Sequence, residues 1–128
     1  MKKLNDDGRA FADEYHLATL STLGPTGLIH AVAVGFTFDG EVVRIITNDG
    51  SQKVRNVERD PRASVTQVAG ARWLSLSGRA GIERDPDAVA HAVALYAQRY
   101  RTPRPNPQRV VIRIVPQKLL GSAALLEG

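Results

Sequence analysis

The sequence predicts a mainly β fold of the α+β class, in which six antiparallel strands and short helices form one domain over residues 1–128. Two observations carry this prediction. Six short segments are apolar or alternate between apolar and polar residues, and turn residues such as Gly24-Pro25 and Asp39-Gly40 separate several of them. Helical patterns interrupt these segments at only a few places. Strands joined by tight turns favour a closed or nearly closed barrel, because closure leaves no unpaired strand edges.

The first half of the chain is predicted to be a short helix followed by three strands. Phe11 and Tyr15 are four residues apart, so they share one face of a helix over residues 7–15. The strands are expected over residues 17–23, 28–38 and 41–47. The second strand is apolar on both faces, with small residues along one of them. We therefore expect a second subunit to cover the apolar face that the barrel interior does not bury.

The second half is predicted to contain two helices and three strands. One helix begins after Ser51 and stops before Pro61, because proline cannot continue the helical hydrogen bonds. The other, over residues 86–100, begins with Asp85 as its N-cap and Pro86 at its first position. The strands are expected over residues 62–68, 72–84 and 109–115, with an extended proline-rich loop over 102–107 and a short tail after the last strand.

The composition limits which kinds of partner the protein can bind and which kinds of chemistry it can perform. The formal net charge is +4, the three histidines are scattered, and cysteine is absent. These counts exclude disulfides and thiolate chemistry, and no metal site is expected. The chain has no apolar run of membrane-spanning length, so we expect a cytoplasmic protein without a membrane partner. The positive charge favours an anionic partner, but the basic residues form no dense run, which argues against nucleic acid.

Residues 50–57, with the sequence GSQKVRNV, form the most informative segment. A Gly-Ser turn, a helix start and the cations Lys53 and Arg55 follow directly after a strand-like segment. The unpaired N–H groups of a helix start and the charge of Lys53 together offer an anion donors and an opposite charge. The same pattern also fits a surface helix that Ser51 caps and whose cations are solvated. From these residues alone, both interpretations stay open.

The chain offers few acids and nucleophiles for catalysis. It lacks the patterns of Walker nucleotide sites, dinucleotide-binding folds, zinc proteases and serine hydrolases. The adjacent carboxylates of Asp13 and Glu14 point different ways on a helix and fit a solvated face. His30 lies among apolar residues in mid-strand, where a hydrogen-bonded structural histidine is the default. The protein therefore either binds without chemistry or takes its reactivity from an organic cofactor, and we expect no catalytic side chain.

The order of these segments resembles the pyridoxamine 5'-phosphate oxidase-like split β-barrel flavoproteins over nearly the whole chain. The resemblance lies in the strand pair, the helix at 51–57, the Asp60-Pro61-Arg62 segment behind it and the strand at 73–78. Residues 32–38, 71–76 and 96–107 resemble the branch that uses the deazaflavin coenzyme F-420, and most closely its biliverdin reductases. The segment 96–107 is the most specific of the three.

The resemblance implies a six-stranded split β-barrel of the FMN-binding type, and a homodimer with two equivalent sites between the subunits. It implies that the coenzyme's phosphate-bearing tail binds at Ser51, Gln52, Lys53, Arg55, Asn56 and Val57. The floor under the tricyclic ring is expected at His30, Val32, Val34 and Thr47, and the wall at Gln67, Ala71, Arg72, Trp73 and Leu74. The coenzyme's acidic tail or the substrate's propionates are expected at Arg99, Arg101, Arg104 and Arg109. Trp73 also fits ordinary interface packing, and Arg109 also fits a cation at the start of a strand.

The activity that the resemblance implies is that of an oxidoreductase. It transfers a hydride from reduced coenzyme F-420 to a conjugated small molecule. The acceptor that the resemblance implies most closely is biliverdin, which is reduced to bilirubin. An FMN-dependent oxidase or flavin reductase is the alternative within the fold, because the helix at 51–57 does not separate the two coenzymes. A cofactor-free module that binds a tetrapyrrole or a nucleic acid is the alternative from another class.

Overall fold

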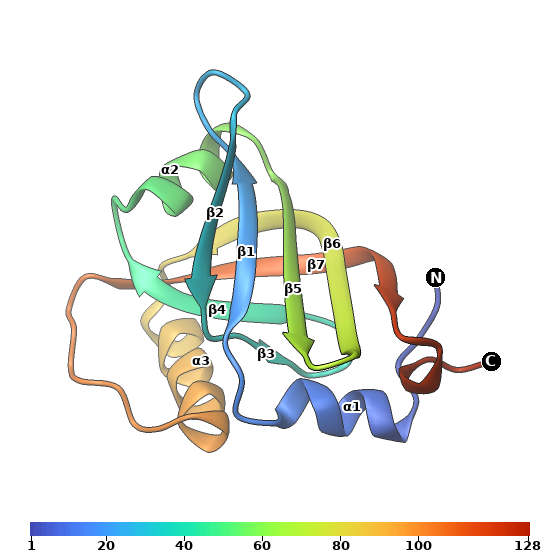
Figure 1. The fold of residues 1–128 in the computed structure, drawn as a ribbon. Helices are drawn as coiled ribbons and strands as arrows, with labels where there is room; N and C mark the ends of the chain where they lie inside the picture. Colours follow the sequence, from blue (N-terminus) through green and yellow to red (C-terminus); the bar gives the residue numbers. More distant parts are fainter.

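A single curled sheet with helices at its ends makes up the fold, and the computed structural model describes residues 1–128 (Figure 1). In chain order the elements are α1 (Asp6–Asp13), β1 (Ala18–Leu23), β2 (Ile29–Val34), β3 (Thr37–Phe38), β4 (Val43–Asn48), α2 (Gln52–Arg59), β5 (Arg62–Ala69), β6 (Arg72–Glu83), α3 (Pro86–Arg99), β7 (Arg109–Gly121) and a 3-10 helix (Ala123–Leu125). The two ends of the chain meet, because Leu4 forms an antiparallel bridge with Leu126.

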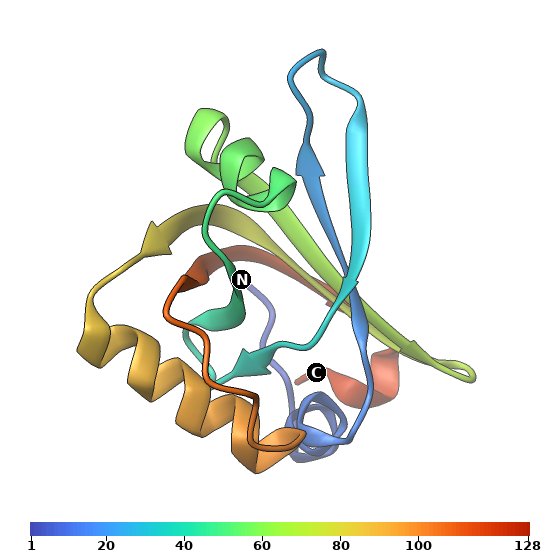
Figure 2. The same ribbon diagram turned by 90° about the vertical axis from the view of Figure 1, so that its left-hand side faces the viewer.

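The strands form one 7-stranded antiparallel sheet in the order β2-β1-β5-β6-β7-β4-β3. The sheet is strongly curled, and its two edge strands, β2 and β3, follow one another directly in the chain (Figure 2). This arrangement is the half-closed barrel that a split-barrel fold requires. The predicted fold class is therefore confirmed, although the sheet has seven strands where six were predicted.

The additional strand arises because the segment predicted as one strand over 28–38 is divided into β2 and β3. At the break, α3 packs closely against the backbone. A Cβ atom on Gly35 would lie 2.9 Å from the Tyr96 ring and 3.0 Å from the Tyr100 ring. The Tyr100 hydroxyl accepts a hydrogen bond from the Phe36 N–H at 3.2 Å. Contact with a helix therefore takes the place of strand pairing at these residues.

The last strand is longer than predicted. It was expected to end at Val115 and to be followed by a short tail. Pro116, the next residue, has no N–H to donate to a sheet. The pairing between β6 and β7 instead shifts register between Ser77 and Gly78, and Gly78 lies opposite Pro116. A Cβ atom on Gly78 would overlap the Val115 carbonyl, so glycine permits this irregularity. β7 therefore continues to Gly121.

The core fills the concave side of the sheet. Its largest fully buried side chains include those of Phe11, Phe36, Leu20, Ile45, Leu74, Leu76, Ile112 and Ile114. Along the opposite face, the outward side chains of β1, β2 and β5 are exposed, among them Thr19, Ile29, Ala31, Ala33 and Val68. The helices thus leave one broad face of the sheet without cover.

The helix caps follow the sequence signals in α3 but not in α2. In α3 the Asp85 carboxylate accepts from the Ala88 N–H at 3.1 Å, and Pro86 occupies the first turn, as predicted. In α2 the predicted cap residue, Ser51, makes no capping hydrogen bond. None of the helices is both long enough and apolar enough to cross a membrane.

Candidate functional site

The start of α2 is the first feature of the site, and it is built by the turn that follows β4. Gly50 takes a φ of 77°, a conformation that side chains disfavour, and this turns the chain into the helix. Ser51 holds the N-cap position with an extended backbone, yet its hydroxyl is buried and has no hydrogen-bond partner. The first N–H groups of α2 therefore have no side-chain acceptor. A helix start in this state can receive an anion.

Lys53 supplies a positive charge one residue into the helix. Its side chain is half-buried, and loss of water around the ammonium group lowers the pKa of Lys53. No carboxylate contributes to this pKa, and no ion pair in the structure involves Lys53. A partly desolvated cation without a partner is a costly arrangement unless an anion compensates for it. Lys53 and the uncapped helix start lie together, as the sequence predicted.

A hydrogen-bonded network fixes α2 to the sheet behind this end. Asn56 is fully buried, and its amide donates to the Thr22 hydroxyl on β1 at 3.1 Å. The Gln52 amide donates to the Asn56 side-chain oxygen at 2.7 Å, and Arg59 donates to the same oxygen at 3.1 Å. Arg55 in turn donates to the Gln52 side-chain oxygen at 3.1 Å. Of the predicted tail-binding residues, Asn56 thus also holds the helix against the sheet, and Gln52 and Arg55 extend its hydrogen-bond chain along the helix.

The sequence analysis did not select two members of this network, Thr22 and Arg59. Thr22 was a detectable signal, because it is a polar residue at an inward position of a strand whose neighbour Leu20 is fully buried. Arg59 gave no such signal. Its contact with the Leu23 carbonyl joins residues 36 apart in the chain and depends on the docking of α2.

The predicted ring floor is divided between β2, which pairs with β1, and the end of β4. His30 is paired with Thr22 across the β1–β2 ladder, and its Nδ1 atom is buried without a hydrogen-bond partner. Val32 packs at the edge of the core, and Val34 belongs to the core itself. Thr47 lies at the end of β4, just before the turn into α2. The Nδ1 atom of His30 is therefore a buried polar group of this floor that no group of the chain satisfies.

The predicted ring wall is divided between buried and exposed residues. Gln67 and Leu74 are fully buried, and the Gln67 amide donates to the Phe11 carbonyl at 2.8 Å. Any contribution of these two side chains to a site is therefore indirect, through packing. Ala71, Arg72 and Trp73 are exposed at the turn between β5 and β6.

The exposed wall residues lie far from α2 within one chain. Arg72 forms a two-pronged ion pair with Glu14, at 2.9 and 3.1 Å, beside the end of α1. The turn that carries Arg72 and the helix α2 are at opposite ends of the sheet (Figure 1). A single subunit consequently does not bring the predicted wall and the predicted tail site together.

The four predicted arginines differ in how their side chains are used. Arg99 is half-buried and donates to the carbonyls of Glu14, Phe36 and His16 and to the side-chain oxygen of Gln67. Arg109 donates to the Arg104 carbonyl at 2.8 Å, which joins the proline-rich loop to β7. Arg101 and Arg104 are exposed, and none of the ion pairs includes their side chains.

The proline-rich loop reaches the turn before α2. The Asn106 amide contacts the Asn48 side chain, and the Asp49 N–H donates to the Gln108 carbonyl at 2.8 Å. Arg104 and Arg109 therefore come from a segment tied to the start of α2. Arg99, in contrast, is committed to contacts within the subunit.

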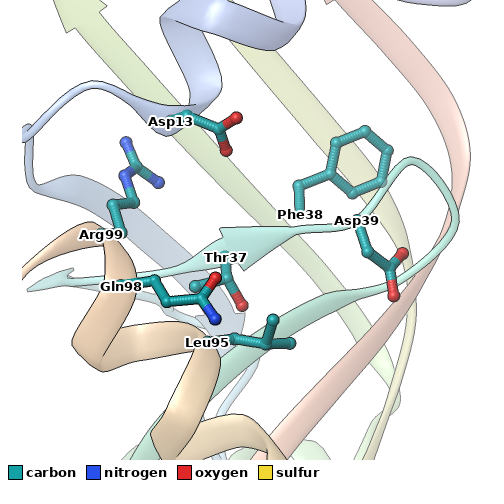
Figure 3. Close-up of a pocket in the computed structure, with 7 residues that line it drawn as sticks. All are labelled: Asp13, Thr37, Phe38, Asp39, Leu95, Gln98 and Arg99. Carbon is teal, nitrogen blue, oxygen red and sulfur yellow. The ribbon is translucent and has the colours of Figure 1, made fainter.

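A separate pocket of about 270 Å³ lies between α1, β3 and α3 (Figure 3). Its lining residues are Asp13, Thr37, Phe38, Asp39, Leu95, Gln98 and Arg99. Of the predicted site residues, only Arg99 lines it. This pocket is therefore distinct from the predicted site at α2.

Comparison with known proteins identifies relatives of the chain. The family model described as "Pyridoxamine 5'-phosphate oxidase" matches residues 4–122. A protein of Mycobacterium tuberculosis (strain CDC 1551 / Oshkosh), named "F-420H(2)-dependent biliverdin reductase", is 55% identical over 127 residues, covering 98% of this chain and 93% of that protein.

Solved structures agree with this result. A conserved hypothetical protein of Mycobacterium tuberculosis has a TM-score of 0.80 at 29% identity, covering 90% of this chain and 81% of that one. A structure described as "F420 Reductase" has a TM-score of 0.74 at 24% identity, covering 88% of this chain and 94% of that one. The second similarity shows a shared fold.

Proposed function

Because the chain belongs to the pyridoxamine 5'-phosphate oxidase family, we propose that it is an oxidoreductase that depends on the deazaflavin coenzyme F-420. It transfers a hydride from the reduced coenzyme to a conjugated acceptor, and the acceptor we propose is biliverdin, reduced to bilirubin. The observation that carries this proposal is the 55% identity over 98% of the chain to a protein named for that reaction.

The start of α2 fits the phosphate-bearing tail of such a coenzyme. A phosphate needs several donors and a positive charge, and it is held best where those donors have no other acceptor. The buried Ser51 hydroxyl has no partner, the helix start is uncapped, and Lys53 has no carboxylate beside it. Arg55 adds an exposed cation one turn along the same helix. We assign the tail to these groups.

In the proposed reaction, the chemistry of hydride donation comes from the bound coenzyme. The part played by the protein is placement, since we expect no catalytic side chain. α2 anchors the tail, and the β2 floor, with His30 and Val32, orients the ring. Fixing donor and acceptor carbons at about 3 to 3.5 Å lowers the entropic part of the barrier. Arg101 and Arg104 are exposed cations suited to the carboxylates of the acceptor.

The complete site in this proposal requires a second copy of the chain. Ile29 and Val68, on the uncovered face of the sheet, are 68% and 63% exposed, and Trp73 is 38% exposed. On the same face, Ser64 and Ser75 hydrogen-bond to one another at 3.3 Å. A second subunit that covers them therefore leaves neither hydroxyl group without a hydrogen-bond partner. A homodimer that buries this face brings the β5–β6 turn of one copy toward the α2 of the other.

The dimer is tested separately from the chemistry. Ala31→Glu places a charge on the uncovered face of the sheet without disturbing the core, because Ala31 is exposed. The expected result is a monomer in analytical ultracentrifugation that has lost coenzyme binding. A wild-type protein that sediments as a monomer with the coenzyme bound contradicts the shared site.

The proposed activity is tested by equilibrium titration with coenzyme F-420 and with FMN, followed by stopped-flow reduction of biliverdin. Tighter binding of the deazaflavin and loss of biliverdin absorbance support the proposal. The family also favours a second candidate, an FMN-dependent oxidase or flavin reductase, and tighter binding of FMN identifies it. Affinity for nucleic acid that falls steeply with salt, without affinity for either coenzyme, contradicts both.

A further inference from the structure

Beside α2, three charged side chains meet that belong to none of the groups assigned above. Arg84 lies in the short connection between β6 and α3. Its guanidinium contacts both oxygens of the Asp49 carboxylate, through Nε at 3.1 Å and Nη2 at 2.9 Å. Nη2 also donates to Glu58 Oε2 at 3.2 Å. One arginine therefore serves two carboxylates from two different segments.

The first of these carboxylates lies at the end of α2 that carries the anion-binding groups. Asp49 precedes Gly50 in the turn into the helix, and its Oδ1 atom accepts from the Gly50 N–H at 3.0 Å. A negative charge at this position competes with a phosphate for the positive potential of the helix start. The second carboxylate, of Glu58, lies in the last turn of the same helix.

The ion pair with Arg84 favours the charged form of the Asp49 carboxylate. The Arg84 guanidinium is the largest cause that holds the pKa of Asp49 below its usual value. Asp49 is therefore not neutralised by taking up a proton, and a neighbouring cation can offset its charge. In this structure Arg84 is the cation that does so for both Asp49 and Glu58.

We propose that Arg84 is a positioning residue of the anion site: it offsets part of the negative charge of Asp49 and Glu58 beside α2, and so favours binding of an anionic group at Ser51 and Lys53. This inference rests on the proposed function, because it assumes that the coenzyme's phosphate binds at the start of α2. Arg84 acts through its two carboxylate partners and needs no contact with the coenzyme.

The test measures the dissociation constant of coenzyme F-420 for the wild type and for Arg84→Gln. At about 10 mM salt the variant should bind about 2-fold more weakly, the effect of losing one positive charge about 10 Å from a phosphate in a high dielectric. At about 0.5 M salt, where the screening length falls below half of that distance, the difference should disappear. A purely structural role for Arg84 predicts no such dependence on salt.

Two further variants separate the effect of the charge of Arg84 on coenzyme binding from the effect of losing its side chain. In the triple variant Asp49→Asn, Glu58→Gln, Arg84→Gln, the carboxylates are removed with the arginine, and affinity should return to that of the wild type or exceed it. Arg9→Gln is the matched control, because it also removes one positive charge and one ion pair, with Asp6 on α1, at the opposite end of the sheet (Figure 1). Its dissociation constant should equal that of the wild type.

The outcomes distinguish the two proposals. If Lys53→Ala weakens binding and Arg84→Gln does not, the inference about Arg84 is wrong and the phosphate site stands. If Arg84→Gln weakens binding equally at both salt concentrations and the triple variant stays weak, charge cancellation is also wrong. If Lys53→Ala leaves binding unchanged, the assignment of the phosphate to α2 fails, and the inference about Arg84 fails with it.

Discussion

Burial lowers the pKa of two cations, Lys53 on α2 and Arg99 on α3, and the structure surrounds them in opposite ways. The Arg99 guanidinium donates hydrogen bonds to four acceptors, three of which are backbone carbonyls. Lys53 has neither a carboxylate nor any other side-chain acceptor. Both side chains lose water on folding, but only one of them recovers hydrogen bonds within the chain.

This difference separates a structural cation from a binding cation. A desolvated cation with satisfied donors stabilises the fold, because its hydrogen bonds compensate for the lost water. A partly desolvated cation with free donors is left to the remaining water until an anion binds beside it. Charge and position in the sequence therefore do not distinguish the two roles, whereas the number of unused donors does.

The largest expected effect is the loss of stability in Arg99→Met. This substitution keeps much of the aliphatic volume, leaves the Gln67 side-chain oxygen without its donor, and leaves the Phe36 carbonyl with only the Tyr100 hydroxyl, at 3.4 Å. Hydrogen bonds to a charged group contribute about 1.5 to 3 kcal/mol each, so we expect unfolding to become easier by about 3 kcal/mol in urea titrations. Arg101→Met, at an exposed position, is the control and should change stability by less than about 0.5 kcal/mol. Equal stability of the two variants contradicts a structural role for Arg99.

The next effect concerns binding rather than stability. Lys53→Ala should weaken binding of the proposed coenzyme by about 1.5 to 3 kcal/mol, the scale of a hydrogen bond to a charged group. Because Lys53 has no partner in the chain, the free energy of unfolding should stay within about 0.5 kcal/mol of the wild type. Isothermal titration and urea unfolding measure the two quantities. A large loss of stability would falsify the view that the donors of Lys53 are free.

Much of the fold could be predicted because its signals are local. Asp85 and Pro86 marked the start of α3 within one residue, and Pro61 marked the end of α2. The break at Gly35 could not be predicted in this way. It depends on the approach of Tyr96 and Tyr100, which lie more than sixty residues away in the chain.

The site was predictable where a segment carries its own chemistry, and less so where contacts join distant segments. Ser51 and Lys53 act from one helix start, so their proximity followed from the sequence. Arg99 was predicted to bind substrate, but its bond to Gln67 joins β5 to α3 and commits it to the interior. That pairing depends on tertiary packing, and no periodicity in either segment indicates it.

A third prediction compares the two helix starts directly. Asp85 caps α3 through the Ala88 N–H, so Asp85→Ala should destabilise the protein by about 1 kcal/mol. Ser51 makes no such bond, and Ser51→Ala should therefore cost less than about 0.3 kcal/mol of stability. The same Ser51 variant should lower coenzyme affinity by about 10-fold, because a hydrogen bond to a charged phosphate contributes about 1.5 kcal/mol. If Ser51→Ala destabilises as much as Asp85→Ala, Ser51 is a cap and the helix start is not open to an anion.

The smallest expected effect is a dependence of stability on pH that comes from Lys53. Its pKa in the folded protein lies below the ordinary value of 10.5, so folding disfavours the protonated form. The penalty is fully present below the folded pKa and disappears as the pH rises toward 10.5, because the unfolded chain then holds protons that the folded one has released. The wild type should therefore gain stability relative to Lys53→Met between neutral pH and about pH 10. Urea titrations of both proteins at each pH measure this difference in unfolding free energy, and the contributions of the other titrating groups cancel in it. Bound coenzyme should abolish this gain, because an anion beside Lys53 raises its pKa again. If the difference between the two proteins does not change with pH when coenzyme is absent, then Lys53 is already compensated within the chain and its contrast with Arg99 does not hold.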